Sequence, residues 1–169
     1  LPVTLPAQQR PNEAAAERWA LGAVVLSVVL VAAKMSVFAL SGSTAVLADA
    51  LESTINILTS GFAYYAVRLS RVPRDDDHPY GHGKVEYLSA TTEGLLLASA
   101  GVAILVVATP QLWAPQTPAA LDVTSAAIAS IAAFTWLAGL AITRAGRRHE
   151  SPSLRADGVH LRADAFTSL

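Results

Sequence analysis

The chain of 169 residues has no cysteine, which excludes disulfide bonds and metal sites built on thiolate ligands. Charge is also scarce: Asp, Glu, Lys and Arg make up 15% of the residues, against about 25% in ordinary soluble domains. Hydrophobic residues reach 53%, and the mean hydropathy is +0.43. This composition favours a protein embedded in membrane lipid, in which any metal ion is held by nitrogen and oxygen atoms. With a formal net charge of −1, no nucleic-acid partner is expected.

Long apolar runs divide most of the chain. A helix needs about 20 residues to cross a hydrocarbon core of roughly 30 Å. Four runs reach this length, at residues 19–40, 45–69, 87–109 and 121–142, and a fifth begins near Ser153. Only residues 41–43 separate the first two runs, which predicts a tight helical hairpin. The sequence therefore predicts an all-α, polytopic membrane helix bundle.

Basic residues indicate how the predicted bundle is oriented. Most of them lie before the first run, between the second and third, or around the link between the fourth and fifth: Arg10, Arg18, Arg68, Arg71, Arg74, Lys84, Arg144, Arg147, Arg148 and Arg155. The links at residues 41–43 and 110–120 contain neither Lys nor Arg. Since basic loops stay in the cytoplasm, we expect the N-terminus there. Residues 1–18 are predicted to be a cytoplasmic tail, whose Pro- and Gln-rich first ten residues are disordered.

Three polar side chains interrupt the second apolar run on one helical face. Asp49, Glu52 and Asn56 stand three and seven residues apart, which at about 100° per residue places them within an arc of roughly 60°. A carboxylate at bilayer depth costs on the order of 2.5–3.5 kcal/mol, so such groups usually line a cavity or an ion path. The spacing predicts a polar face inside the bundle.

The start of the fifth run repeats this arrangement. Asp157, His160 and Asp164 stand at the same spacing of three and seven residues. Two helices that present oxygen and imidazole ligands on matching faces can form one metal site between them.

A second polar cluster lies in the link between the second and third runs. Asp75, His78 and His82 fall within ten residues that are rich in Asp, His and Gly. Imidazole and carboxylate together suit a divalent ion such as Zn²⁺. The alternative is a solvated loop whose acidic residues offset nearby arginines.

Two further charged residues lie within apolar runs. Lys34 is either an ion-path residue or a structural lysine that snorkels or pairs with Asp49. Glu93 has no ligand-like partner at helical spacing, and we leave it out of the predicted site.

Three segments resemble hallmarks of the cation diffusion facilitator family of divalent-metal transporters. They are Ser-Gly-Ser-Thr-Ala-Val-Leu-Ala-Asp-Ala at residues 41–50, Asp-His-Pro-Tyr-Gly-His-Gly-Lys-Val-Glu at 77–86, and Ala-Asp-Gly-Val-His-Leu-Arg-Ala-Asp at 156–164. The resemblance extends from about residue 20 to residue 169. It implies a cation-efflux transmembrane domain over residues 19–169 with five of six transmembrane helices, truncated in the fifth span. On this resemblance, the sixth span and the C-terminal cytoplasmic domain are absent.

The resemblance also implies a set of metal ligands. The family's transport site takes two ligands four residues apart from the second span and two from the fifth, which correspond here to Glu52, Asn56, His160 and Asp164. The first pair departs from the family pattern, which usually has His or Asp followed by Asp. A loop site found in some members corresponds to Asp75, His78 and His82. Asp49 and Asp157 match accessory positions that flank the membrane ligands.

The function implied is export of a divalent cation from the cytoplasm by alternating access, in exchange for protons. Zn²⁺ is favoured as the substrate, with Mn²⁺ or Fe²⁺ as alternatives. We expect a homodimer in the bacterial inner membrane, without enzymatic activity. Two rival functions stay open: a membrane-embedded metallohydrolase, whose ion would activate water, and a non-transporting metal-binding subunit. The chain lacks a His-Glu-x-x-His motif, which disfavours the first rival.

Overall fold

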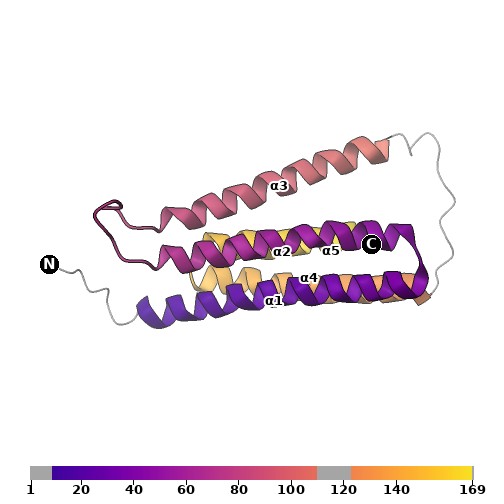
Figure 1. Ribbon diagram of the computed structural model, residues 1–169, viewed down its shortest axis with the longest axis horizontal. Coiled ribbons are helices and arrows are strands. Elements are labelled where there is room, and N and C mark those ends of the chain that lie inside the picture. The colour runs from indigo at the N-terminus through magenta and orange to yellow at the C-terminus, as the bar shows by residue number, and fades with distance from the viewer. Residues whose placement is uncertain (1–8, 110–122, 169) are drawn as a thin grey trace.

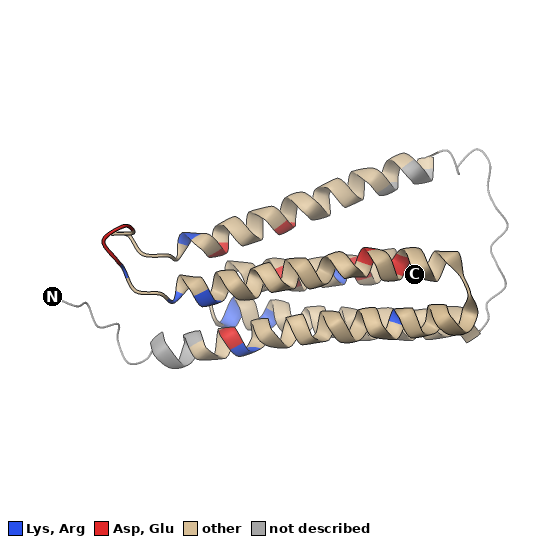
Figure 2. Cartoon of the chain, viewed as in Figure 1, with Lys and Arg blue, Asp and Glu red and all other residues tan. Residues whose placement is uncertain are grey.

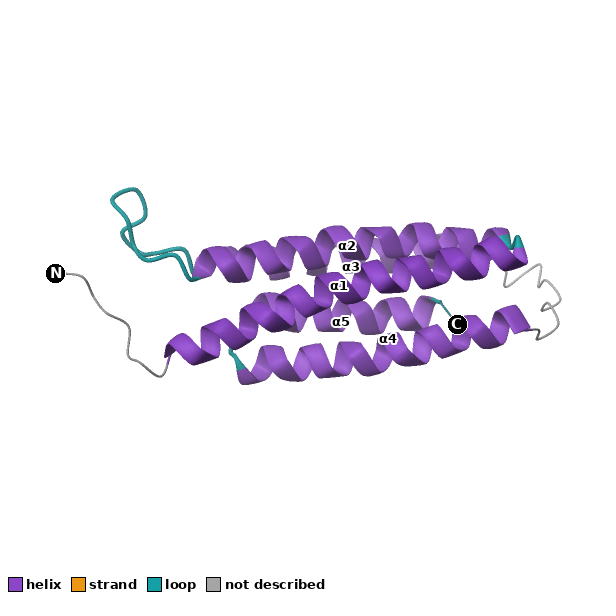
Figure 3. Cartoon of the chain, turned by 60° about the horizontal axis from the view of Figure 1, so that its bottom comes forward, coloured by secondary structure: helices purple, strands orange, loops and turns teal. Residues whose placement is uncertain are grey.

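The structure, a computed structural model, describes residues 9–109 and 123–168, which form five helices and no strand (Figure 1, Figure 3). The helices are α1 (Gln9–Ser41), α2 (Thr44–Ser70), α3 (Lys84–Ala108), α4 (Val123–Arg148) and α5 (Pro152–Thr167). The prediction of an all-α bundle is confirmed.

The predicted hairpin between α1 and α2 is present. Only Gly42 and Ser43 separate the two helices, and Gly42 takes a left-handed conformation with φ of 65°. Its backbone N–H donates to the carbonyl oxygen of Phe38 at 2.8 Å, which closes the end of α1. A glycine is favoured at this position because it has no Cβ to oppose a positive φ.

Two helices, α1 and α4, extend furthest beyond the predicted runs. Helix α1 begins at Gln9, so Gln9 and Arg10 are helical instead of disordered; the following residues are rich in Ala and Glu, which are strong helix formers. Residues 1–8 of the predicted tail lie outside the described residues. Helix α4 continues six residues beyond Ile142, to Arg148, because basic side chains are favourable at the C-terminal end of a helix. The start of the fourth run and the link before it also lie outside the described residues.

Within the described residues, two helices have both the length and the hydropathy of a membrane span. They cover Ala14–Ser41, with a mean hydropathy of 2.4, and Val123–Arg148, with 1.8. Helices α2 and α3, with 27 and 25 residues, also have the length to cross a bilayer. Helix α2 carries the two acidic residues Asp49 and Glu52 within its length.

Helix α5 packs against α2, α3 and α4. Its residues Leu154 and Leu161 are fully buried and belong to the main hydrophobic cluster together with Val67 of α2. This position allows the polar residues of α5 to face the other helices instead of lipid.

Glycines bring α4 and α5 into close contact. A Cβ atom added to Gly158 of α5 would lie 2.5 Å from the backbone nitrogen of Thr143 and 2.8 Å from the carbonyl oxygen of Gly139. Small residues at such crossings let helix backbones approach one another in membranes. Since Gly158 lies between Asp157 and His160, this contact fixes where the polar face of α5 stands.

Most of the Lys and Arg residues gather at one end of the bundle, the end that holds the α2–α3 loop (Figure 2). At this end Arg71 forms an ion pair with Glu17, and Ser70 donates to Glu86 at 2.8 Å. Figure 2 also shows acidic residues on α2, toward the opposite end of the bundle.

We predict that Gly158→Ala destabilises the α4–α5 pair, because backbone atoms cannot move aside as a flexible side chain would. Overpacking of this kind costs about 1–3 kcal/mol. As a control, Gly61→Ala on α2 places its Cβ in open space, so it should be neutral or stabilising by up to about 1 kcal/mol. Thermal unfolding followed by circular dichroism compares the two variants. Equal melting temperatures would mean that the close helix approach is not required.

Candidate metal site

The four predicted membrane ligands line one open cavity of about 800 Å³ between α2, α3 and α5. Glu52 and Asn56 come from α2, and His160 and Asp164 come from α5. Asn56 and His160, which are 104 positions apart in the sequence, therefore face the same space. The helical spacing within each pair and the packing of α5 against α2 together produce this arrangement.

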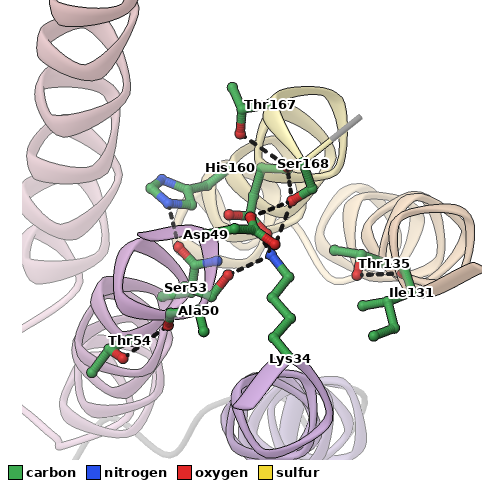
Figure 4. A network of polar contacts seen from close by, with 12 residues as sticks. Lys34, Asp49, Ala50, Ser53, Thr54, Ile131, Thr135, His160, Thr167 and Ser168 are labelled. Atoms are coloured by element: carbon green, nitrogen blue, oxygen red, sulfur yellow. Dashed lines mark hydrogen bonds and ion pairs between the residues drawn. The ribbon is translucent and has the colours of Figure 1, made fainter. Parts of the chain in front are cut away.

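His160 and Asn56 are in direct contact. The Nε2–H group of His160 donates to Oδ1 of Asn56 at 2.8 Å (Figure 4). With the proton on Nε2, the neutral ring keeps a lone pair on Nδ1. That Nδ1 atom is buried and has no hydrogen-bond partner in the described part of the chain. A neutral imidazole nitrogen is a common metal ligand.

Lys34 of α1 lies at the centre of a network of polar contacts (Figure 4), and Asp164 belongs to this network. Asp164 is 7% exposed, and its Oδ2 lies 3.5 Å from Nζ of Lys34. The same Nζ lies 2.9 Å from Oδ1 of Asp49, so the predicted pairing of these two residues is confirmed. Lys34 thus connects the accessory position Asp49 to a predicted ligand. Glu52, in contrast, is exposed and lines the cavity.

Asp157 lies apart from this cavity. Its Oδ1 accepts a hydrogen bond of 2.6 Å from Ser60, whose hydroxyl is also 3.1 Å from that of Ser27. Asp157 therefore joins α5 to α2 and α1. The other oxygen, Oδ2, is buried without a hydrogen-bond partner among the described residues.

Glu93, which we left out of the predicted site, lines a second cavity of about 340 Å³ together with His160. It is 1% exposed, accepts from Ser89 at 3.3 Å and has one oxygen without a partner in the described chain. Helical spacing gave no signal of a ligand at this position, because the other ionisable groups that line this cavity, Arg147, Arg155 and His160, come from α4 and α5. The second cavity extends to Arg147 and Arg155 at the basic end of the bundle.

The loop residues Asp75, His78 and His82 also come together. Their ligand atoms all lie within 4.8 Å of one another. The Nδ1–H and backbone N–H groups of His78 donate to Oδ1 of Asp75 at 2.9 and 2.6 Å, and Nε2 of His82 lies 3.7 Å from Oδ2. Gly81, at φ of 78°, allows the turn that returns His82 toward Asp75.

Electrostatics keep the loop carboxylate charged. Desolvation raises the pKa of Asp75, but the hydrogen bonds from His78 and the charges of His78 and His82 outweigh it, so the pKa lies below its usual range. One carboxylate and two imidazoles at this separation could supply three of the four ligands of a tetrahedral Zn²⁺ site.

A family model described as the cation efflux transmembrane domain matches residues 20–169. The chain belongs to the cation diffusion facilitator family. Proteins of this family are transporters and not enzymes, and they are embedded in membranes. The resemblance seen in the sequence is therefore confirmed, and the metallohydrolase alternative is excluded. Ligation of a metal by the particular residues of either cluster stays a prediction.

Curated relatives support the same family. An uncharacterized transporter of Synechocystis is 39% identical over 139 residues, covering 80% of this chain and 44% of that protein. Metal tolerance protein C1 of Arabidopsis thaliana is 32% identical over 180 residues, covering 95% and 37%. The cation-efflux pump FieF of Serratia proteamaculans is 29% identical over 148 residues, covering 87% and 49%. The chain spans about half, or less, of the length of these cation diffusion facilitator relatives.

We predict that the double variant His78→Ala, His82→Ala binds one ion fewer than the parent chain, because two of the three loop ligands are lost. Zn²⁺ titration by calorimetry measures the stoichiometry. His149→Ala, which removes a histidine from the α4–α5 link, is the matched control and should leave the number of ions unchanged. An unchanged stoichiometry in the double variant would favour the solvated-loop interpretation.

Proposed function

We propose that the protein carries a divalent metal ion across the membrane, out of the cytoplasm, by way of the cavity between α2, α3 and α5. One observation carries the proposal: Glu52, Asn56, His160 and Asp164, from two helices, line a single cavity. The Nδ1 atom of His160 is also buried without a hydrogen-bond partner among the described residues. A cation is the ligand that such a set of oxygen and nitrogen atoms accepts.

The charge of these ligands suits a divalent ion. With His160 neutral, Glu52 and Asp164 supply two formal negative charges, and Asn56 supplies a neutral carbonyl oxygen. A doubly charged ion leaves such a set neutral, which matters because an uncompensated charge is costly in a low dielectric.

The ligand types favour a transition metal and give moderate selectivity among such ions. His160 makes the site acceptable to Zn²⁺ and Fe²⁺, whereas the carboxylate and amide oxygens suit Mn²⁺. Zn²⁺ is our favoured substrate because it accepts imidazole and carboxylate together at a four-ligand site.

Two cavities that share His160 support alternating access. One extends from His160 toward Arg147 and Arg155 at the basic end, which we assign to the cytoplasm by the positive-inside rule. The other holds the four ligands and extends toward Ala103 and Thr167. Rocking of the helices would open the ion to one cavity and then to the other.

Exchange for protons follows from the ligand chemistry. Carboxylates and imidazole must be deprotonated to bind a metal ion, so ion entry releases protons and reprotonation favours ion release. We propose that this competition couples metal export to proton entry in a homodimer of the bacterial inner membrane, with the N-terminus in the cytoplasm.

We predict that Asp164→Ala abolishes metal binding in the membrane cavity and metal-dependent flux. Insertion of the helices should be unaffected, because removing a charge at bilayer depth does not hinder it. Metal flux into sealed proteoliposomes loaded with a metal-sensitive dye measures the effect. The protein used is the longest form that transports metal in this assay. Asp76→Ala, which removes an exposed loop carboxylate outside both clusters, is the control. Undiminished flux in Asp164→Ala would refute the assignment, and absence of flux in the parent protein would favour a non-transporting subunit.

We predict that Asn56→Asp tightens divalent-ion binding at neutral pH and makes the affinity rise more steeply with pH. The new carboxylate adds a negative charge, but it must lose its proton before the metal enters. Titrations with Mn²⁺ and Zn²⁺ between about pH 5.5 and 8, in a chain without the loop histidines, measure both effects. If neither the affinity nor its pH dependence changes, Asn56 is not a ligand.

A further inference from the structure

Lys34 occupies an unusual position for a lysine. It is 1% exposed in the middle of the bundle and crosses from α1 to oxygen atoms of α2 and of the C-terminal end of α5 (Figure 4). Its Nζ donates to Ser53 at 2.6 Å, to Asp49 at 2.9 Å and to Ser168 at 2.9 Å. The fourth contact, with Asp164, is longer at 3.5 Å.

These distances separate the partners of Lys34 into two groups. An ammonium group has three hydrogens to donate, and the three short contacts account for them. Asp164 is therefore held mainly by charge, so its carboxylate can turn toward an ion while Lys34 keeps its other partners. Lys34 can therefore keep its three short hydrogen bonds when an ion enters the cavity.

The charges around the cavity include more than the predicted ligands. Asp49, Glu52 and Asp164 carry three formal negative charges when ionised, and Lys34 carries one positive charge. The net formal charge is thus two minus, which equals the charge that a divalent ion neutralises. Without Lys34, the same groups would carry three minus, and a divalent ion would leave one charge uncompensated in a low dielectric.

We propose that Lys34 sets the charge of the membrane cavity so that it selects divalent ions and releases them. The lysine neutralises Asp49, and it weakens the attraction between Asp164 and the bound ion. Lys34 acts through these carboxylates and does not touch the ion, so it is a specificity-determining residue and not a ligand. This inference rests on the proposed function, because it requires the ion to bind at Asp164.

The test measures Mn²⁺ affinity for the full chain in lipid nanodiscs, with His78→Ala and His82→Ala present in every sample to remove the loop cluster. We expect Lys34→Met to bind Mn²⁺ roughly tenfold more tightly, because a positive charge near the ion is removed. Asp49→Asn should bind it roughly tenfold more weakly by the same reasoning. The variant with both substitutions again has a net formal charge of two minus, and its affinity should return toward that of the parent chain. Lys84→Met is the matched control, because it removes the other lysine of the sequence outside this network.

A trivalent ion provides a second readout. Coulomb energy is proportional to ion charge, so a tenfold effect of Lys34→Met on Mn²⁺ corresponds to about thirtyfold on Tb³⁺. Tb³⁺ luminescence, in competition with Mn²⁺, measures this ratio. A lysine that only braced the helices would not change the two affinities in proportion to charge.

The outcomes separate this inference from the proposed function. If Asp164→Ala in the same background binds Mn²⁺ with the affinity of the parent chain, the proposed position of the ion site is wrong. If Asp164→Ala abolishes binding but Lys34→Met leaves the Mn²⁺ affinity and the Tb³⁺ preference unchanged, only the role of Lys34 is overturned. Should Lys34→Met fail to fold, the variant with both substitutions still decides, since it also removes the charge of Asp49, the closest carboxylate partner of Lys34. An affinity in that variant as weak as in Asp49→Asn would overturn the inference.

Discussion

Compensation of charge in a low dielectric is the constraint on which this structure depends. A buried carboxylate needs a cation, a proton or several hydrogen-bond donors to compensate its charge. A protein that carries cations must leave some carboxylate charge without a protein partner, so that the cation can compensate it. The bundle divides its acidic groups accordingly. Asp49 has Lys34 at 2.9 Å, whereas Asp157 has the hydroxyl of Ser60 at 2.6 Å on one oxygen and no partner among the described residues on the other. Glu52 lines the open cavity, where an ion could satisfy its charge.

Helix α5 shows how a polar segment can lie inside a membrane bundle. It has 16 residues, the fewest of the helices described, and two aspartates, two arginines and a histidine interrupt its apolar positions. It stays within the bundle because α2, α3 and α4 pack against it. The glycine contacts with α4 bring it close, and Arg162 lies over the ring of Trp136 at 4.4 Å. Neighbouring helices therefore shield from lipid a helix that could not face it alone.

Much of this arrangement could be predicted from the sequence, because helical spacing specifies which residues share a face. The hairpin at Gly42, the paired faces of α2 and α5 and the loop cluster around Asp75 all followed from spacing or motif. The contact of Lys34 with Asp164 did not, because it joins residues 130 positions apart and depends on how α1 and α5 are rotated. The cavity that Glu93 shares with His160 was not predicted either, because it depends on how α3 packs against α5.

The short link between α1 and α2 has a mechanical consequence. With only Gly42 and Ser43 between them, the two helices form one hairpin that contains both Lys34 and Asp49. Asp164 belongs to a second hairpin, made by α4 and α5 through their glycine contacts. Rocking of one hairpin away from the other would stretch the contacts of Lys34 with Asp164 at 3.5 Å and with Ser168 at 2.9 Å, and would leave the Lys34–Asp49 pair intact. The lysine and its partner would then travel together as a neutral unit, so the moving parts need not separate a fully paired buried charge at each cycle.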